Sequence, residues 1–253
     1  MLVFIGSKKT ILVLYAITFL LALYIAWPAI TAGVPPSEEG KQPETAGYIF
    51  LAILAATVFL LALIKLLPWI LRYLLLLLEV LLLFPAAYIV LSVFGEVPAL
   101  LGALWITYTR IFFRWRWIRN VSALLIGALT AGVVGVLFSP HVLVILLLIL
   151  VVYDYVSVFV TKHMLRLARQ IVGEGKPSGT FALGLGDVVF PIALAVSASR
   201  IHIWVPLALL PLVLLAVYYA LRTVEKTGKG VPALPPITFA LLLGLTVILF
   251  LFP

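Results

Sequence analysis

Residues 140–163 read PHVLVILLLILVVYDYVSVFVTKH, a run of apolar side chains that contains one carboxylate, Asp154. At about 1.5 Å per residue, this run forms a helix long enough to cross the hydrocarbon core of a bilayer, which is about 30 Å thick. An ionisable group inside that core is costly unless it faces a partner or a water-filled cavity. The stretch therefore predicts a membrane-spanning helix and marks Asp154 as a candidate functional residue.

The whole chain shares this apolar character. Of its 253 residues, 65% are hydrophobic and 10% are charged, and the mean hydropathy is +1.30. A soluble protein of this length cannot bury so much apolar surface, because its own surface needs polar cover. The composition excludes a disordered chain, a nucleic-acid module and a secreted disulfide scaffold. With no cysteine, the chain forms neither a disulfide nor a thiolate nucleophile. We therefore expect an integral membrane protein.

Nine apolar stretches are long enough to be spans, so the predicted fold class is all-α, a polytopic membrane protein with nine transmembrane helices. One membrane-embedded domain would cover 1–253, with an N-terminal six-helix part to about residue 163 and a C-terminal part from about residue 180. The loop 31–45 is expected to be a polar connector. The predicted spans are Thr10–Ile30, Ala46–Leu66, Arg72–Phe94, Val97–Phe113, Val121–Phe138, Pro140–His163, Thr180–Ser199, Ile203–Arg222 and Ala233–Phe252.

Lysine and arginine are distributed unevenly between the two sides that these spans would separate. With the N-terminus inside, the inner segments hold 15 of the 17 basic side chains, and the outer segments hold Lys41 and Arg200. Short loops rich in lysine and arginine stay in the cytoplasm, so we expect the N-terminus in the cytoplasm and the C-terminus outside the cell membrane. The basic and aromatic stretch 110–119 then lies at the bilayer surface, which explains it better than nucleic-acid binding does.

Two further carboxylates fall inside spans, Glu79 and Asp187. Asp154 lies 8 residues before Lys162 at the inner end of its span, or about 12 Å deep, and Asp187 lies 7 residues after Thr180, or about 10 Å deep. On consecutive antiparallel helices the two aspartates would face each other at nearly the same level. A satisfied polar group is the plainer interpretation of each aspartate alone, but the matched depth favours a functional pair. For Glu79, pairing across the bundle is favoured over assisting water access.

Glycines and prolines flank this pair. Gly184-Leu185-Gly186-Asp187 puts two glycines just before the second aspartate, where missing side chains allow close backbone approach and local loosening of the helix. Glycine is also simply common in membrane helices. At the start of the last span, Pro232-Ala233-Leu234-Pro235 either interrupts the helix and lines the carboxylate cleft, or is an ordinary helix start with proline in its first turn. The composition favours neither interpretation over the other.

The motifs Tyr153-Asp154, Gly184-Leu185-Gly186-Asp187 and Pro232-Ala233-Leu234-Pro235 together resemble the signature of the presenilin and signal peptide peptidase family of intramembrane aspartyl proteases, the GxGD type. They occur in the family's order, on the sixth, seventh and ninth spans, whereas the first five spans match by count and hydropathy alone. The resemblance implies a presenilin-like fold with Asp154 and Asp187 as the catalytic aspartates. It also implies a site shaped by Tyr153, Gly184, Leu185, Gly186, Pro232, Ala233, Leu234 and Pro235.

The resemblance has further implications for processing and partners. The connection at about 164–179 is short, whereas presenilins carry a long loop there that is cut during maturation, so we expect no such cut. The chain resembles a compact microbial presenilin homologue that acts without accessory subunits, alone or as a homo-oligomer. Its partners would be the lipid bilayer and transmembrane-helix protein substrates. The proline motif and the inferred orientation resemble presenilin more than signal peptide peptidase, which implies single-span substrates with their N-terminus outside.

Two carboxyls close together in a low-dielectric site cannot both ionise easily, so we expect them to share one proton. The ionised member would act as general base on a water that attacks the scissile carbonyl, and the protonated member would stabilise the oxyanion. This mechanism requires no cofactor, no metal and no covalent intermediate. A substrate helix must first unwind. Its frayed backbone could pair near Pro232–Pro235, with the loops 164–179 and 223–232 as candidate gates.

The main alternative is a proton- or cation-coupled transporter or channel, in which intramembrane aspartates relay protons or bind cations. Transporters often contain internal repeats, and the sequence shows none of fixed period. The cost of two buried carboxyls disfavours a purely structural scaffold. The histidines His141, His163 and His202 fall at span ends without metal-ligand spacing. Asp→Asn substitution separates the two main hypotheses, because an enzyme loses cleavage whereas a transporter loses flux and never yields peptide fragments.

Overall fold

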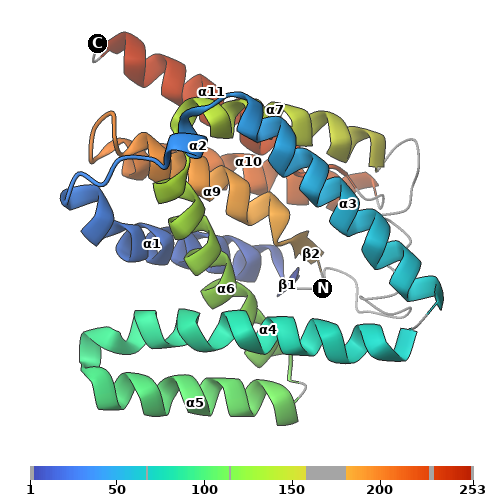
Figure 1. Ribbon diagram of the computed structural model, residues 1–253. Helices are drawn as coiled ribbons and strands as arrows, with labels where there is room; N and C mark the ends of the chain where they lie inside the picture. The colour runs from blue at the N-terminus through green and yellow to red at the C-terminus, as the bar shows by residue number, and fades with distance from the viewer. Residues whose placement is uncertain (1–2, 67, 114, 158–180, 228–230, 252–253) are drawn as a thin grey trace.

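The computed structural model describes residues 3–66, 68–113, 115–157, 181–227 and 231–251. Long helices make up most of these residues, and two short strands lie side by side near the N-terminus (Figure 1). The helices are α1 (Lys8–Thr31), α2 (Glu38–Lys41), α3 (Glu44–Leu66), α4 (Pro68–Leu91), α5 (Glu96–Phe112), α6 (Arg116–Leu137), α7 (Pro140–Tyr155), α9 (Gly186–Ala198), α10 (Val205–Thr227) and α11 (Leu234–Leu251), with a 3₁₀ turn at Ser92–Phe94.

Each predicted span contains one of these helices within the described residues. Five segments are long and apolar enough to cross a membrane: α1, α6, α10, α11 and the stretch Tyr73–Phe94 of α4 and its 3₁₀ turn. Three described segments are apolar but shorter, at Glu44–Phe59, Pro140–Tyr155 and Gly186–Ala198. The protein is therefore a mostly helical, multi-pass membrane protein, and the count of nine spans stays a prediction.

Local sequence determines where α7, the helix that carries Asp154, begins. The side-chain oxygen of Ser139 accepts a hydrogen bond from the backbone N–H of Val142, and Pro140 occupies the first turn, where its missing N–H costs nothing. One face of the helix then packs into the core through buried residues at helical spacing. These are Val142, Leu143, Leu146, Leu147 and Leu150. Residues 158–163 of this predicted span lie outside the described residues.

Helix α6 crosses the centre of the molecule and packs against α1, α4, α5, α9 and the first strand (Figure 1). Glycines let two of these neighbours approach closely. A Cβ added at Gly132 would lie 2.9 Å from the carbonyl oxygen of Ala22 on α1, and one at Gly135 would lie 2.6 Å from the Cβ of Val196 on α9. Real Cβ atoms do not come that close, so both positions require glycine for this packing. Helix α6 thereby holds α1 against α9, the helix that carries Asp187.

The prediction of an all-α fold is wrong in one place, because the described residues contain a two-stranded sheet. Strands β1 (Val3–Gly6) and β2 (Phe181–Gly184) pair antiparallel. The predicted span Thr180–Ser199 therefore begins too early, since α9 starts only at Gly186. All four residues of β2 are apolar or glycine, and hydropathy alone does not distinguish so short an apolar strand from the first turn of a buried helix.

Contacts on both sides of the sheet hold it in place. In β2, Phe181 and Leu183 are buried whereas Ala182 is exposed, which is the alternation of a strand. The Asn120 side chain of α6 accepts a hydrogen bond from the N–H of Ile5 (3.0 Å) and donates one to its carbonyl oxygen (2.9 Å). Along an antiparallel strand, the backbone N–H and C=O groups of successive residues point alternately toward the partner strand and away from it. The backbone groups of Ile5 therefore point toward α6, and those of its neighbours in β1 point toward β2.

Candidate active site

Asp154 and Asp187 lie at the ends of two helices that pack against each other. Asp154 is the penultimate residue of α7, and Asp187 is the second residue of α9. Both residues are half-buried, and the charge of Asp154 acts electrostatically on Asp187. The structure therefore brings the two carboxyls together at a place where each keeps some exposed surface.

The position of Asp187 within its helix differs from the sequence prediction. The sequence predicts it about two turns inside a helix that starts at Thr180, whereas it lies in the first turn of α9, just after β2. The N–H groups of a first turn have no partner within the helix, and a helix N-terminus carries a partial positive charge. A carboxylate is therefore favoured at this end of α9, and a strand rather than a helical turn leads the chain to it.

Gly184 allows the strand to lie close to this carboxylate. A Cβ added at Gly184 would lie 3.2 Å from Oδ2 of Asp187, whereas nothing lies within 4 Å of a Cβ added at Gly186. Of the two glycines, Gly184 is thus the one where the backbone approach depends on a missing side chain. Leu185, between them, packs against α6, because its Cδ1 lies 3.0 Å from the position of a Cβ added at Gly127.

The proline motif lies against the other carboxyl. Leu234 begins α11, and its backbone N–H donates a hydrogen bond to Oδ2 of Asp154 over 3.4 Å. This N–H has no partner within the helix, and Pro235 beside it has no N–H at all. The motif is therefore a helix start with proline in its first turn, and the same helix start lines the carboxylate. Pro232 and Leu234 are buried, and Ala233 and Pro235 are half-buried.

The Tyr153 ring packs against α3, whereas the carboxyl of its neighbour Asp154 meets the start of α11. The ring makes an edge-to-face contact with Phe50 of α3, with ring centroids 6.0 Å apart and an angle of 74° between the ring planes. Helices α3 and α7 are in contact along this side. Tyr153 thereby fixes the end of α7 that carries Asp154 against α3.

The two candidate gates are described only in part. The segment 164–179 lies outside the described residues. In the other candidate, residues 223–227 continue α10 to Thr227, so the helix extends past its predicted end at Arg222, and residues 228–230 lie outside the described residues. An ion pair of 2.5 Å between Glu225 and Lys8 ties this end of α10 to the start of α1.

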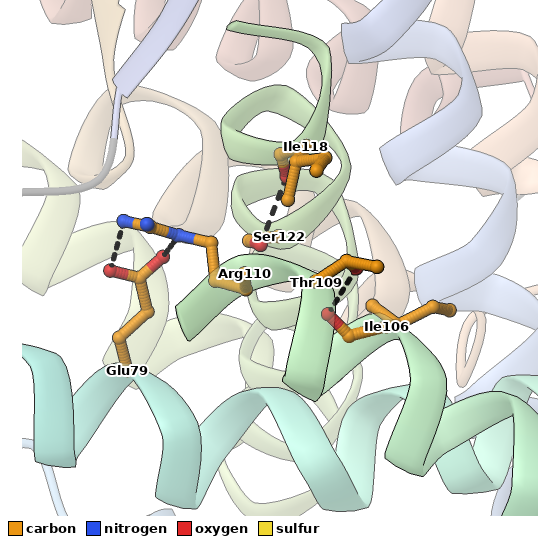
Figure 2. Close-up of polar contacts among 6 residues, drawn as sticks. All are labelled: Glu79, Ile106, Thr109, Arg110, Ile118 and Ser122. Carbon is orange, nitrogen blue, oxygen red and sulfur yellow. Dashed lines mark hydrogen bonds and ion pairs between the residues drawn. The ribbon is translucent and has the colours of Figure 1, made fainter. Parts of the chain in front are cut away.

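Glu79 belongs to the packing of α4 against α5. Its carboxylate accepts two hydrogen bonds from Arg110, 2.5 Å from Nε and 2.7 Å from Nη2 (Figure 2). The side chains of Glu79 and Arg110 are only 11% and 16% exposed. Figure 2 also shows Ser122, whose hydroxyl bonds to the carbonyl of Ile118 within α6. The expectation that Glu79 pairs across the bundle is confirmed.

Sequence reasoning missed a polar residue of α1 that lies near the pair. Tyr15 is fully buried, and the charged group that acts on its hydroxyl is Asp187. The signal that could have found it is a tyrosine inside an apolar span with Thr18 one turn further on the same side of the helix.

The assembled groups suit general acid–base chemistry. Two neighbouring carboxyls can share one proton and hold a water between them, and a fixed backbone N–H orients one of the carboxyls. In the part of the chain that the structure describes, no three histidine, aspartate or glutamate side chains gather as metal ligands.

Comparisons with known proteins agree on one family and one fold. The family model described as signal-peptide peptidase, presenilin aspartyl protease matches residues 10–178, which include Asp154. Two solved structures of a presenilin family intramembrane aspartate protease, in the C222 and P2 space groups, have similar folds. The first is 21% identical with a TM-score of 0.70, over 93% of this chain and 94% of that chain. The second is 22% identical with a TM-score of 0.68, over 94% and 96%. Comparison with curated proteins finds no match.

Proposed function

Because the chain belongs to the signal peptide peptidase and presenilin family of aspartyl proteases, we propose that it hydrolyses peptide bonds within the transmembrane helices of other proteins, with Asp154 and Asp187 as its catalytic pair. It is an enzyme of the intramembrane aspartyl protease class, and it has the presenilin-type fold. The observation that carries the residue assignment is the meeting of the chain's two aspartates at the ends of α7 and α9.

The reaction begins with one ionised and one protonated carboxyl. The ionised carboxyl takes a proton from water as the water oxygen bonds to the scissile carbonyl carbon, and the other carboxyl gives its proton to the carbonyl oxygen. The first carboxyl then protonates the amide nitrogen, the C–N bond breaks, and the second carboxyl takes a proton from the gem-diol. The pair regains its single shared proton, and the base is assigned to the pair rather than to one aspartate. The Leu234 N–H keeps Asp154 oriented throughout.

The substrate must expose its backbone before this chemistry, because a helix hides its carbonyls in internal hydrogen bonds. The backbone groups of Ile5 bond to Asn120 and not to β2, and Ile5 is paired with Ala182 in the sheet. The backbone N–H and C=O of Ala182 therefore also point away from β1. An unwound substrate segment that pairs with this outer edge of β2 gains main-chain hydrogen bonds five residues before Asp187. We therefore place substrate pairing at β2 rather than at Pro232–Pro235, since β2 is already a strand.

The proposal extends to orientation and partners. The protein lies in the cell membrane with its N-terminus in the cytoplasm and its C-terminus outside, acts without accessory subunits, and takes single-span substrates whose N-terminus is outside. The distribution of lysine and arginine supports this orientation. Arg200, one of the two basic residues on the proposed outer side, donates to the carbonyls of Gly135 and Val136 at the end of α6. A capping role for Arg200 explains why a basic residue lies on that side.

The test is cleavage of a single-span substrate by the purified protein in liposomes, with mass spectrometry to locate the cut. Wild type is expected to release fragments cut within the span, and Asp154→Asn and Asp187→Asn are each expected to release none. Glu96→Gln makes the same carboxylate-to-amide change at an exposed site and should cleave like wild type. Cleavage that survives either aspartate substitution would mean that these residues are not the catalytic pair.

The same experiment separates the enzyme from a coupled transporter. A transporter that uses the aspartates would move protons or cations across the liposome membrane and would leave the substrate intact. Flux that disappears with the aspartate substitutions, without any fragments from wild type, would support the transporter in place of the protease.

A further inference from the structure

Tyr15 is one of the buried polar residues that the proposed mechanism leaves unused. Its side chain is 0% exposed, and its hydroxyl has no hydrogen-bond partner among the residues that the structure describes. A buried hydroxyl without a partner is costly, and such groups in native structures call for an explanation. The residue lies inside α1, where a phenylalanine would pack in the same place without a buried polar group. Packing alone therefore does not explain the hydroxyl.

The surroundings of Tyr15 lead directly to the second aspartate. Helix α1 packs against both α9 and β2. One turn after Tyr15, Thr18 meets Leu185 at the surface of α6, since both side chains lie within 3.4 Å of a Cβ added at Gly127. Leu185 is two residues before Asp187, and Asp187 is the charged group that acts on the Tyr15 hydroxyl.

We propose that Tyr15 is a positioning residue for Asp187, and that its hydroxyl hydrogen-bonds the Asp187 carboxyl when the site closes on substrate. The inference rests on the proposed function, because it assigns a role within that catalytic pair. Catalytic hydrogen bonds are often unformed before substrate binds and tighten in the reacting complex. A closing movement of α9 toward α1 would give the orphaned hydroxyl its partner.

A phenol suits this position because of the proton that the pair shares. When Asp187 is ionised, the Tyr15 hydroxyl donates to it, and when Asp187 carries the proton, the phenol oxygen accepts from it. The backbone N–H of Leu234 would then orient Asp154, and the side chain of Tyr15 would join the backbone of Gly184 in orienting Asp187. Lysine or arginine here would hold Asp187 permanently ionised and would prevent this exchange.

The experiment compares Tyr15→Phe with Tyr24→Phe in the full-length protein, using cleavage of the same single-span substrate. Tyr24 lies on the same helix but is 41% exposed, so it controls for loss of a hydroxyl from α1. Tyr15→Phe is expected to lower kcat about tenfold or more, with KM nearly unchanged, because a hydrogen bond to a charged group is lost. Tyr24→Phe should match wild type in both constants.

The pH profile distinguishes positioning from simple packing. Among the described residues, Asp187 interacts electrostatically with Asp154 from α7 and Tyr15 from α1, and Gly184 from β2 lies beside it. The Tyr15 hydrogen bond forms in the closed complex with substrate, so its loss leaves Asp187 less stabilised in its ionised form there. The acidic limb of kcat should therefore move to higher pH by about one unit. Thermal stability should stay the same or rise, because the substitution removes an unpaired buried hydroxyl.

A fluorotyrosine in place of Tyr15 keeps the shape and strengthens the donor, so it should move the acidic limb in the opposite direction. This variant keeps the inference testable if Tyr15→Phe does not fold. Wild-type kcat and an unmoved pH profile in either Tyr15 variant, beside an inactive Asp187→Asn, would overturn the role of Tyr15 and leave the proposed function intact. An active Asp187→Asn would overturn the proposed function itself.

Discussion

Asn120→Ala should release the N-terminal strand from α6 and weaken the support of Asp187. The wild-type side chain makes both hydrogen bonds to Ile5, and both residues are buried, at 8% and 3% exposed. Each bond contributes about 1 kcal/mol, and leaving the buried N–H and carbonyl of Ile5 without these partners adds a further cost, so we expect β1 to lose about 2–4 kcal/mol of local stability. At about 1.4 kcal/mol per tenfold, the Ile5 amide should exchange its hydrogen roughly 30 to 700 times faster.

Hydrogen exchange resolved to single residues, together with the cleavage assay, tests this expectation. Cleavage should fall along with Ile5 protection, because β1 supports β2 and β2 leads the chain to Asp187. Ser122→Ala is the matched control, since the Ser122 hydroxyl is also buried on α6 but bonds within its own helix. Unchanged protection of Ile5 in Asn120→Ala would show that the Asn120 side chain does not hold β1 against α6. Full activity with Ile5 exchanging freely would show that β1 does not hold the site.

Three further predictions test separate parts of the structure. Glu79→Gln should cost about 3–5 kcal/mol of stability in detergent unfolding, because it leaves Arg110 buried without its partner. The double variant Glu79→Leu with Arg110→Met should recover most of that loss. Equal stability of Glu79→Gln and the double variant would contradict a buried pair. Gly135→Ala should destabilise the protein by about 1–3 kcal/mol, because its Cβ meets α9 at 2.6 Å. Gly47→Ala, with nothing within 4 Å, should stabilise α3 by about 0.5–1 kcal/mol, so the same sign for both glycines would contradict the packing described. Ala182→Pro should raise KM several-fold without changing the thermal midpoint, since the outer edge of a strand tolerates a missing N–H; an unchanged KM would remove β2 from substrate binding.

Apolar runs locate the helices of this chain well because each helix in a membrane must be apolar over a long stretch. The structure places a helix in every predicted span, and the boundaries of α3 and α11 differ from prediction by only one or two residues. Short segments carry no such signal. In Phe181–Gly184 the side chains are apolar on both faces, so the strand could be recognised only from its pairing with β1, some 180 residues away along the sequence.

The candidate site was predictable to the extent that its residues are anomalous in the sequence. A carboxylate within an apolar run is conspicuous, and Asp154 and Asp187 both stand out for this reason. What each of them touches depends on the packing of distant segments. The N–H that Leu234 donates to Asp154 comes from 80 residues away, and the closeness of Tyr15 to Asp187 depends on how α1 packs against α9.

The two interpretations of the proline motif illustrate the same limit. A proline at a helix start and a proline that lines a cleft both fit a position without a backbone N–H, so the sequence looks the same in the two cases. The structure shows that they are not alternatives here. Leu234 begins α11 and, with its free N–H, bonds to Asp154.

In the proposed reaction, Asp154 and Asp187 together activate a water that cleaves a peptide bond inside a substrate helix. The most direct measurement is a single-turnover cleavage in water labelled with heavy oxygen, followed by mass spectrometry of the fragments. Wild type should place one heavy oxygen atom in the new C-terminal carboxyl of a fragment cut within the span, and Asp154→Asn and Asp187→Asn should yield no such fragment. Labelled fragments from either variant would mean that the substituted aspartate is not needed to activate the water.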